Sequence, residues 1–245
     1  MKYKIKIAYD GKEYSGFQIQ PNGNSIQETI EKVLSKISSE KISIVGSSRT
    51  DAGVHANGQV AHFIYQKSNL SLKSINSLLP NDIRIISLEE VSLDFHARYS
   101  AKEKIYHYHI TTDKVQSPFE RGYCLHYTFP IDIEKLLAAI PYFIGTKNFS
   151  SFANELSPNK NPVKTIYELS FIKTKSGFIL KFRGDGFLYK MVRNITGTLL
   201  DIARGKINFE ILPLIFEKKS RVFAGKTAPP HALFLETIVY NEFIM

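Results

Sequence analysis

The chain opens on Met1-Lys2-Tyr3-Lys4-Ile5-Lys6-Ile7-Ala8-Tyr9, a stretch in which lysine alternates with apolar residues. This period-two alternation is typical of a strand with one buried face, and here the second face is basic. Asp10-Gly11 predicts a turn, and Ser25-Ile26-Gln27-Glu28 has the spacing of a capping box. Apolar residues then continue to Ile37 at helical spacing. The sequence therefore predicts a strand followed by an amphipathic helix.

The rest of the chain mixes strands and helices without the regular alternation that a parallel sheet requires. In the first half we expect strands at 42–45, 59–65 and 83–91 and a short helix at 72–79. In the second half we expect strands at 104–111, 165–173, 178–183 and 234–240 and helices at 133–140, 188–204 and 209–217. This pattern predicts an α+β fold with a largely antiparallel sheet. We expect two subdomains that share the sheet, 1–103 and 104–245.

The composition favours a polyanionic partner. The 245 residues include 32 Lys and Arg against 23 Asp and Glu, which gives a net charge of +9. The single cysteine, Cys124, excludes an intrachain disulfide and suits a reducing compartment. No stretch reaches the roughly 18 continuous apolar residues of a membrane span, and Met1–Tyr9 lacks the apolar core of a signal peptide. These observations predict a cytoplasmic protein.

A loop suited to chemistry follows the expected strand at 42–45 and reads Arg49-Thr50-Asp51-Ala52-Gly53-Val54-His55. Its small residues and glycine let the backbone approach a ligand closely. Arg49 places a cation beside the Asp51 carboxylate, and a nearby cation lowers a carboxylate's pKa and keeps it ionised, as a nucleophile requires. On the loop alone, an ordinary aspartate that caps a turn is the commoner alternative.

The loop also carries a family resemblance. Arg49 to Ala56, followed by Gly58-Gln59-Val60-Ala61-His62-Phe63, resembles the signature of the TruA family of tRNA pseudouridine synthases. Further matches lie in the family's order along nearly the whole chain: Tyr9-Asp10-Gly11 with Gly16-Phe17-Gln18-Ile19-Gln20, Phe95-His96-Ala97-Arg98-Tyr99-Ser100-Ala101 with Tyr106, Phe187-Leu188-Tyr189-Lys190-Met191-Val192-Arg193-Asn194-Ile195, and Lys226-Thr227-Ala228-Pro229-Pro230 with Leu233-Phe234-Leu235. Two positions depart from the family pattern. Phe17 stands where tryptophan is usual, and Ser48 stands where glycine is common.

The resemblance implies two ferredoxin-like subdomains with the active site in a cleft between them. It implies that the enzyme isomerises uridine to pseudouridine at positions 38, 39 and 40 of the tRNA anticodon stem-loop, without a cofactor. It also implies a homodimer whose basic surface grips one tRNA. Within this chain, the lysine face of the first strand is a candidate for part of that surface.

The same resemblance implies roles for four residues. Asp51 is the catalytic carboxylate. The target base must be flipped out of the RNA stack, and Arg49 then occupies the vacated space. Tyr106 stacks on the flipped uracil, and Arg193 pairs with Asp51 to keep it ionised. Without the resemblance, Arg49 is a surface phosphate binder, Tyr106 packs in the core and Arg193 is a solvated arginine.

Other classes of function remain open from the residues themselves. A non-catalytic RNA-binding module would make Asp51 dispensable, and a carboxylate-dependent nucleoside or glycoside hydrolase would require a second acid that the loop lacks. Gly184-Asp185-Gly186-Phe187-Leu188-Tyr189 resembles a dinucleotide-binding motif, but Tyr189 stands at the third glycine. The histidines at 96, 107 and 109 lack a carboxylate or cysteine that would complete a metal site, so we expect no metal.

Overall fold

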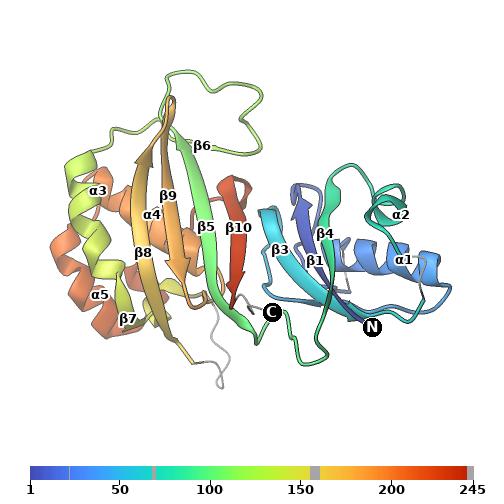
Figure 1. The fold of residues 1–245 in the computed structure, drawn as a ribbon. Coiled ribbons are helices and arrows are strands. Elements are labelled where there is room, and N and C mark those ends of the chain that lie inside the picture. Colours follow the sequence, from blue (N-terminus) through green and yellow to red (C-terminus); the bar gives the residue numbers. More distant parts are fainter. Residues whose placement is uncertain (22, 68–69, 155–160, 242–245) are drawn as a thin grey trace. The chain divides into compact units, whose positions relative to one another are not determined.

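The chain divides into two compact units in the computed structural model, which describes residues 1–21, 23–67, 70–154 and 161–241 (Figure 1). Unit 1 comprises Met1–Lys102 and Phe234–Met245, and unit 2 comprises Glu103–Leu233. The subdomain boundary expected after residue 103 lies beside the passage from unit 1 to unit 2. The C-terminal segment, Phe234–Met245, groups with unit 1.

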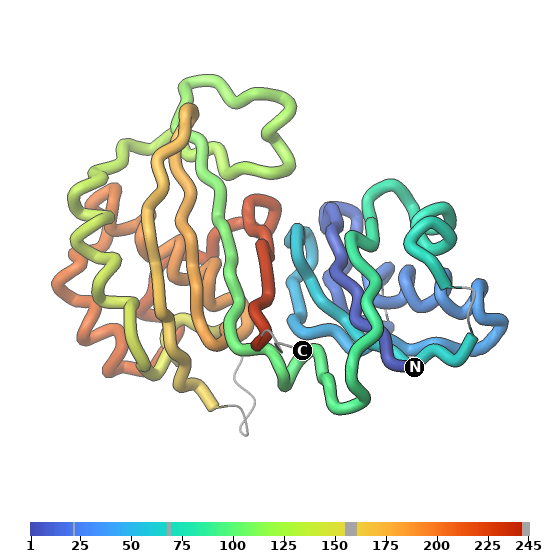
Figure 2. The backbone as a smooth tube through the Cα atoms, viewed as in Figure 1, coloured from blue at the N-terminus to red at the C-terminus, as the bar shows by residue number. Residues whose placement is uncertain are grey.

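Within its described residues, unit 1 is a mostly antiparallel sheet with two helices. Its strands lie in the order β4-β1-β3-β10, β2 pairs with β3, and only β10 runs parallel to its neighbour β3. In Figure 2 the red strand β10 runs beside the cyan strand β3, although almost the whole of unit 2 separates them in sequence. The elements are β1 (Lys2–Tyr9), α1 (Ile26–Ser38), β2 (Val45–Gly46), β3 (His55–Ile64), α2 (Leu72–Asn76), β4 (Ile83–Val91) and β10 (Leu233–Tyr240).

The first strand and helix form as their sequences predict. Along β1, Ile5, Ile7 and Tyr9 are buried. Helix α1 begins after Ser25, whose hydroxyl accepts the backbone N–H of Glu28 at 3.1 Å. This contact satisfies one of the unpaired donors at the helix start.

The basic face of β1 is partly engaged within unit 1. The Lys4 ammonium lies 2.7 Å from a carboxylate oxygen of Glu89 on β4. The Lys2 ammonium donates to the carbonyls of Leu93 and Phe95, the latter at 2.9 Å. Two of the three lysines that we expected to contribute to an RNA surface therefore have partners in the fold.

Unit 2 is an antiparallel sheet, β5-β9-β8-β7, with the short strand β6 parallel to β5. Its strands are β5 (Ala101–Thr111, which starts in unit 1), β6 (Leu125–His126), β7 (Gly145–Asn148), β8 (Val163–Lys173) and β9 (Gly177–Gly184). Its α-helices are α3 (Ile133–Ala139), α4 (Met191–Ala203) and α5 (Leu212–Lys218). Short 3₁₀ segments lie at Ile140–Phe143, Ser150–Phe152, Phe209–Ile211, Arg221–Phe223 and Pro230–Ala232.

Helix α4 is the buried helix of unit 2, since all thirteen of its residues are buried. We expected it to start at residue 188. It starts at Met191, because Lys190 adopts a left-handed conformation with φ 58° that no α-helix continues through. Gly197 lets the chain at 224–228 pass closely over the helix, since a Cβ at this position would lie 1.6 Å from the Lys226 carbonyl oxygen.

The fold class is α+β with mostly antiparallel strands, as predicted. Strand β3 is longer than expected: it begins at His55, where the sequence indicates a loop, and not at Gln59. The strands β6 and β7 were not expected. Within the described ranges, no helix is both long enough and apolar enough to cross a bilayer.

Candidate active site

The loop that carries Asp51 is anchored on both sides of that residue by the N-terminal motif. The Thr50 carbonyl accepts the backbone N–H of Phe17 at 3.2 Å, and the Thr50 hydroxyl lies 2.8 Å from the buried Tyr9 hydroxyl. On the other side, the Gly53 N–H donates to the Tyr14 carbonyl at 3.3 Å. The N-terminal motif and the loop that carries Asp51, two motifs of the family resemblance, are therefore joined by hydrogen bonds.

Gly16 makes the close approach of these two segments possible. Its φ of +105° lies in a region that favours glycine, and a Cβ there would lie 2.7 Å from the Thr50 carbonyl oxygen. Any side chain at residue 16 would therefore push against the backbone immediately before Asp51.

The two side chains of the loop that are expected to act both reach solvent. Ser48 and Thr50 are buried, Arg49 is exposed and Asp51 is partly exposed. The Asp51 carbonyl accepts the Val54 N–H at 3.2 Å and closes a turn. A fixed backbone thus presents one carboxylate and one guanidinium at the surface of unit 1. The catalytic role of Asp51 and the RNA contact of Arg49 stay predictions.

His55 closes the far end of the loop and was not singled out from the sequence. Its ring is 1% exposed and stacks on Phe234 at 4.6 Å. Its Nδ1 accepts the Gly11 N–H at 3.2 Å and lies 3.0 Å from a carboxylate oxygen of Asp10. The hydrogen bond from the Gly11 N–H therefore joins the Asp10-Gly11 turn to the first residue of β3.

Gln59 holds the near end of the loop. Its side chain is fully buried, its amide oxygen accepts the Ser48 N–H at 3.2 Å, and its amide nitrogen donates to the Ser48 carbonyl at 2.8 Å. Position 48 is thus fixed through its backbone, so serine serves there in place of glycine. Phe17 packs on Gly46, where a Cβ would lie 2.3 Å from its ring. An aromatic ring fills this position although the tryptophan is absent.

Tyr106 lies in β5 of unit 2 and is 6% exposed. Its ring meets Phe187 edge-on, with centroids 5.2 Å apart and an interplanar angle of 84°. Two residues from different motifs of the resemblance are therefore neighbours in unit 2. The stacking of Tyr106 on a uracil stays a prediction.

Arg193 lies in the first turn of α4 and is 9% exposed, so the alternative of a solvated arginine is wrong. Its Nε donates to the Ala228 carbonyl at 2.8 Å, and the Ala228 N–H donates to the Arg193 carbonyl at 3.1 Å. The neighbouring Asn194 accepts the Thr227 hydroxyl at 2.7 Å. The closing motif therefore fixes the start of α4, while the pairing of Arg193 with Asp51 stays a prediction.

A family model described as tRNA pseudouridine synthase matches residues 5–100 and 139–241. The chain belongs to the tRNA pseudouridine synthase family. Its relatives include tRNA pseudouridine synthase A 1 of Protochlamydia amoebophila, 50% identical over 98% of this chain and 96% of that protein. Tyr106 lies between the two ranges that the family model matches, so its assignment depends on the resemblance in the sequence motifs.

Two further relatives cover the chain almost completely. The tRNA pseudouridine synthase A 1 of Bacillus cereus is 42% identical over 98% of this chain and 99% of its own length. The tRNA pseudouridine synthase A of Exiguobacterium sibiricum is 40% identical over 98% of this chain and 97% of its own length. Among solved structures, a Cbf5-Nop10-Gar1 complex covers 81% of this chain and 54% of its own at 9% identity, with a TM-score of 0.35 that is too low to support an argument.

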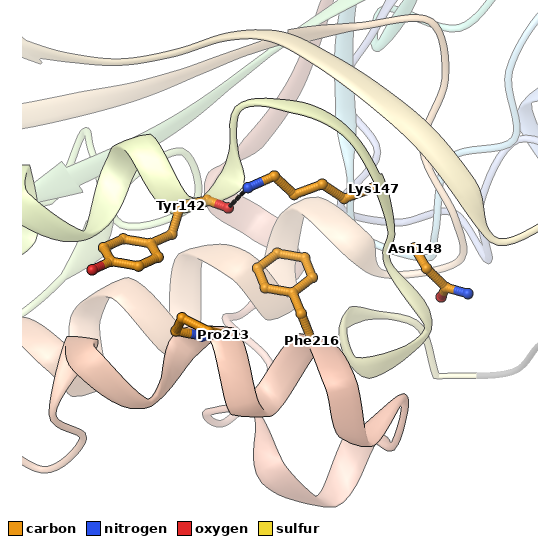
Figure 3. Close-up of a pocket in the computed structure, with 5 residues that line it drawn as sticks. All are labelled: Tyr142, Lys147, Asn148, Pro213 and Phe216. Carbon is orange, nitrogen blue, oxygen red and sulfur yellow. Dashed lines mark hydrogen bonds between the residues drawn. The ribbon is translucent and has the colours of Figure 1, made fainter.

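The glycine motif that suggested nucleotide binding does not have the context of a dinucleotide site. Gly184 ends β9 and α4 starts only at Met191, so the glycine motif does not open a helix as a dinucleotide site does. A pocket of unit 2 is lined by Tyr142, Lys147, Asn148, Pro213 and Phe216 (Figure 3). The Lys147 ammonium there donates to the Tyr142 carbonyl at 2.6 Å and lies 5.4 Å from the centre of the Phe216 ring. None of the expected site residues lines this pocket.

Proposed function

We propose that this protein isomerises uridine to pseudouridine at positions 38, 39 and 40 of the tRNA anticodon stem-loop, with Asp51 as the catalytic carboxylate. Membership of the family makes the chain an isomerase that acts on tRNA. The observation that carries the assignment of Asp51 is its place in the loop. The backbone is held on both sides by the N-terminal motif, while the carboxylate stays partly exposed.

The proposed reaction is balanced within the substrate. The N1–C1′ glycosidic bond breaks, the uracil turns, and a C5–C1′ bond forms. C5 loses a proton and N1 gains one, so the reaction needs no oxidant, reductant or cofactor. An ionised Asp51 provides the charge and the lone pair that this chemistry needs, whichever bond forms first.

Three further residues are proposed to bind the substrate. Arg49, exposed beside Asp51, fills the space left by the flipped nucleotide and holds the RNA backbone. Tyr106 stacks on the uracil, and Arg193 supplies a positive charge that favours the ionised carboxylate. The buried Arg193 suits that role, since a cation in a water-poor site acts more strongly than one in bulk water.

We further propose that both units are ferredoxin-like. Unit 1 follows the order β1-α1-β2-β3-α2-β4, with β1 between β4 and β3 and with β2 antiparallel to β3. This order supports the β-α-β-β-α-β arrangement of that fold. Unit 2 contains β5, α3, β8, β9 and α4, with β9 between β5 and β8, which supports the first five elements of the same arrangement.

The working form is proposed to be a cytoplasmic homodimer. A chain with one cysteine, Cys124, forms no internal disulfide and so suits a reducing compartment. Each subunit carries a net charge of +9, and two subunits double the basic surface available to one tRNA.

The test uses unmodified tRNA transcripts with a single uridine at position 38, 39 or 40 and cytidine at the other two. Chemical mapping should find pseudouridine at each uridine, and a control transcript with cytidine at all three positions should stay unmodified in the anticodon arm. Pseudouridine that forms only at other positions of the tRNA would contradict the proposed target positions. Release of free uracil would favour a hydrolase, and binding without product would favour a non-catalytic RNA-binding module.

A further inference from the structure

A five-residue turn after β4, His96 to Ser100, is held rigid by its own hydrogen bonds. The Ser100 N–H donates to the His96 carbonyl at 2.9 Å, and the His96 N–H donates to the Ser100 hydroxyl at 3.0 Å. The Nδ1 atom of His96 accepts the N–H groups of Arg98 and Tyr99, each at 3.2 Å. The imidazole therefore fixes the backbone at the tip of the turn.

The turn is also attached to the sheet of unit 1. Ala97 is fully buried, its N–H donates to Nδ1 of His62 on β3 at 3.1 Å, and its carbonyl accepts the hydroxyl of Tyr240 on β10 at 2.6 Å. The turn is thus a rigid extension of the sheet.

This rigid turn displays one aromatic and one cationic side chain to solvent. Tyr99 is 76% exposed and Arg98 is also exposed. The His96 ring lies 4.3 Å from the Tyr99 ring, and the Arg98 guanidinium lies 5.9 Å from the centre of the same ring. An aromatic ring that is held in place yet left in water loses little conformational freedom when it stacks on a ligand.

We infer that Arg98 and Tyr99 form an RNA-binding platform, in which Tyr99 stacks on an unpaired base and Arg98 contacts a neighbouring phosphate. The inference rests on the proposed function, since it takes the partner to be the tRNA substrate. A phenol beside a guanidinium offers the two contacts that proteins use for unpaired nucleotides, stacking on the base and a charged contact to the backbone.

The platform lies far from the Asp51 loop along β3. His55 ends that loop and begins β3, and His62, which binds the turn, is seven residues further along the strand. At roughly 3.3 Å per residue the two ends are about 23 Å apart. The platform therefore contacts a nucleotide other than the target uridine, and its loss should weaken tRNA binding without slowing the chemical step.

Unit 2 offers a matched control pair. The Arg183 guanidinium lies 5.7 Å from the centre of the Tyr167 ring, and Tyr167 is 44% exposed. There, however, the guanidinium is engaged by carboxylates, at 3.1 Å from Glu103 and 3.5 Å from Glu168. The same geometry without an available cation should contribute little to RNA binding.

The experiment measures tRNA Kd, salt dependence and single-turnover rate for Tyr99→Ala, Tyr99→Phe, Arg98→Ala and Tyr167→Ala in the full-length protein. We expect Tyr99→Ala to raise Kd roughly 5- to 150-fold, which corresponds to roughly 1–3 kcal/mol for one stacked base. The tRNA Kd of Tyr99→Phe and of Tyr167→Ala should stay near the wild-type value. Arg98→Ala should make the dependence of log Kd on log salt concentration less steep, by the contribution of about one phosphate contact. The single-turnover rate at saturating enzyme should not change.

Unchanged Kd for both Tyr99→Ala and Arg98→Ala would overturn the platform, as would an equal loss in Tyr167→Ala. A weaker Kd that accompanies loss of the dimer in size-exclusion chromatography would assign the turn to a subunit contact and also overturn it. The proposed function can fail separately. If the wild type binds tRNA through these residues and forms no pseudouridine, the platform stands and the proposed reaction does not.

Discussion

Replacing His62 with asparagine should remove a specific part of the protein's pH-dependent stability. Burial lowers the pKa of His62 to about 4 from its ordinary 6.5, and electrostatic interactions with His96 and Lys2 contribute in the same direction. The neutral ring accepts the Ala97 N–H through Nδ1, and protonation of this nitrogen would abolish that bond. An asparagine oxygen preserves an acceptor there but does not titrate.

The direction and size of this change in stability follow from the pKa values of His62 in the folded and unfolded chains. Above pH 6.5 His62 is neutral in both folded and unfolded chains, and its contribution to stability is complete. As the pH falls, the unfolded chain takes up the proton first, so stability is lost between about pH 6.5 and pH 4. A shift of about 2.5 units corresponds to at most about 3 kcal/mol. About 2 kcal/mol of this should be lost by pH 5.

The assay is urea unfolding of wild type and His62→Asn at pH 7.5 and pH 5.0. The variant is expected to be less stable at pH 7.5, because it loses the ring contacts with Phe95 and His96. The difference between the two proteins should shrink by about 2 kcal/mol at pH 5.0, since only the wild type has the titrating imidazole. A difference that is the same at both pH values would refute this account of the buried histidine.

Substitutions at three further residues, Gly16, His55 and Tyr106, test the site and its support. Gly16→Ala should lower the free energy of unfolding by at least about 1–3 kcal/mol, because of its positive φ and the 2.7 Å approach to the Thr50 carbonyl. Gly122→Ala is the control, because a Cβ there meets no atom within 4 Å, and it should leave the free energy of unfolding nearly unchanged. An equal loss of stability in Gly16→Ala and Gly122→Ala would contradict this explanation. His55→Ala should cost about 1–3 kcal/mol in urea unfolding, since the Gly11 N–H loses its acceptor. His55→Asn should recover at least half of the stability that His55→Ala loses. No recovery would argue against the hydrogen bond from the Gly11 N–H. Tyr106→Phe should keep most of the single-turnover rate and Tyr106→Leu should lose it; equal losses would make the hydroxyl essential, against stacking.

Local patterns predicted the elements whose signals lie within a few residues. Strand β4 runs from Ile83 to Val91 as expected, and α1 starts after the Ser25 cap. The start of β3 at His55 was missed because it depends on a distant segment. Phe234 and Leu235 pair with His55 and Ala56, and a sequence pattern does not show which segments meet over such a separation.

The candidate site shows the same limit. Asp51 and Arg49 were predictable because they lie within one contiguous motif. The hydrogen bond between the Gly11 N–H and His55 was not, because these two residues lie more than forty positions apart in the sequence. The burial of Arg193 was also missed, because the segment around Ala228 covers a helix face that a periodicity argument assigns to solvent.

The most direct test of the central claim is the rate of pseudouridine formation by Asp51→Asn and Asp51→Ala under single-turnover conditions, with tRNA Kd measured in parallel. Asp113→Asn, a change at an exposed aspartate of unit 2, is the control. We expect no detectable pseudouridine from either Asp51 variant, a Kd within about threefold of wild type, and full activity in the control. Pseudouridine formation by Asp51→Ala at a rate near wild type would contradict the claim that this carboxylate carries out the reaction.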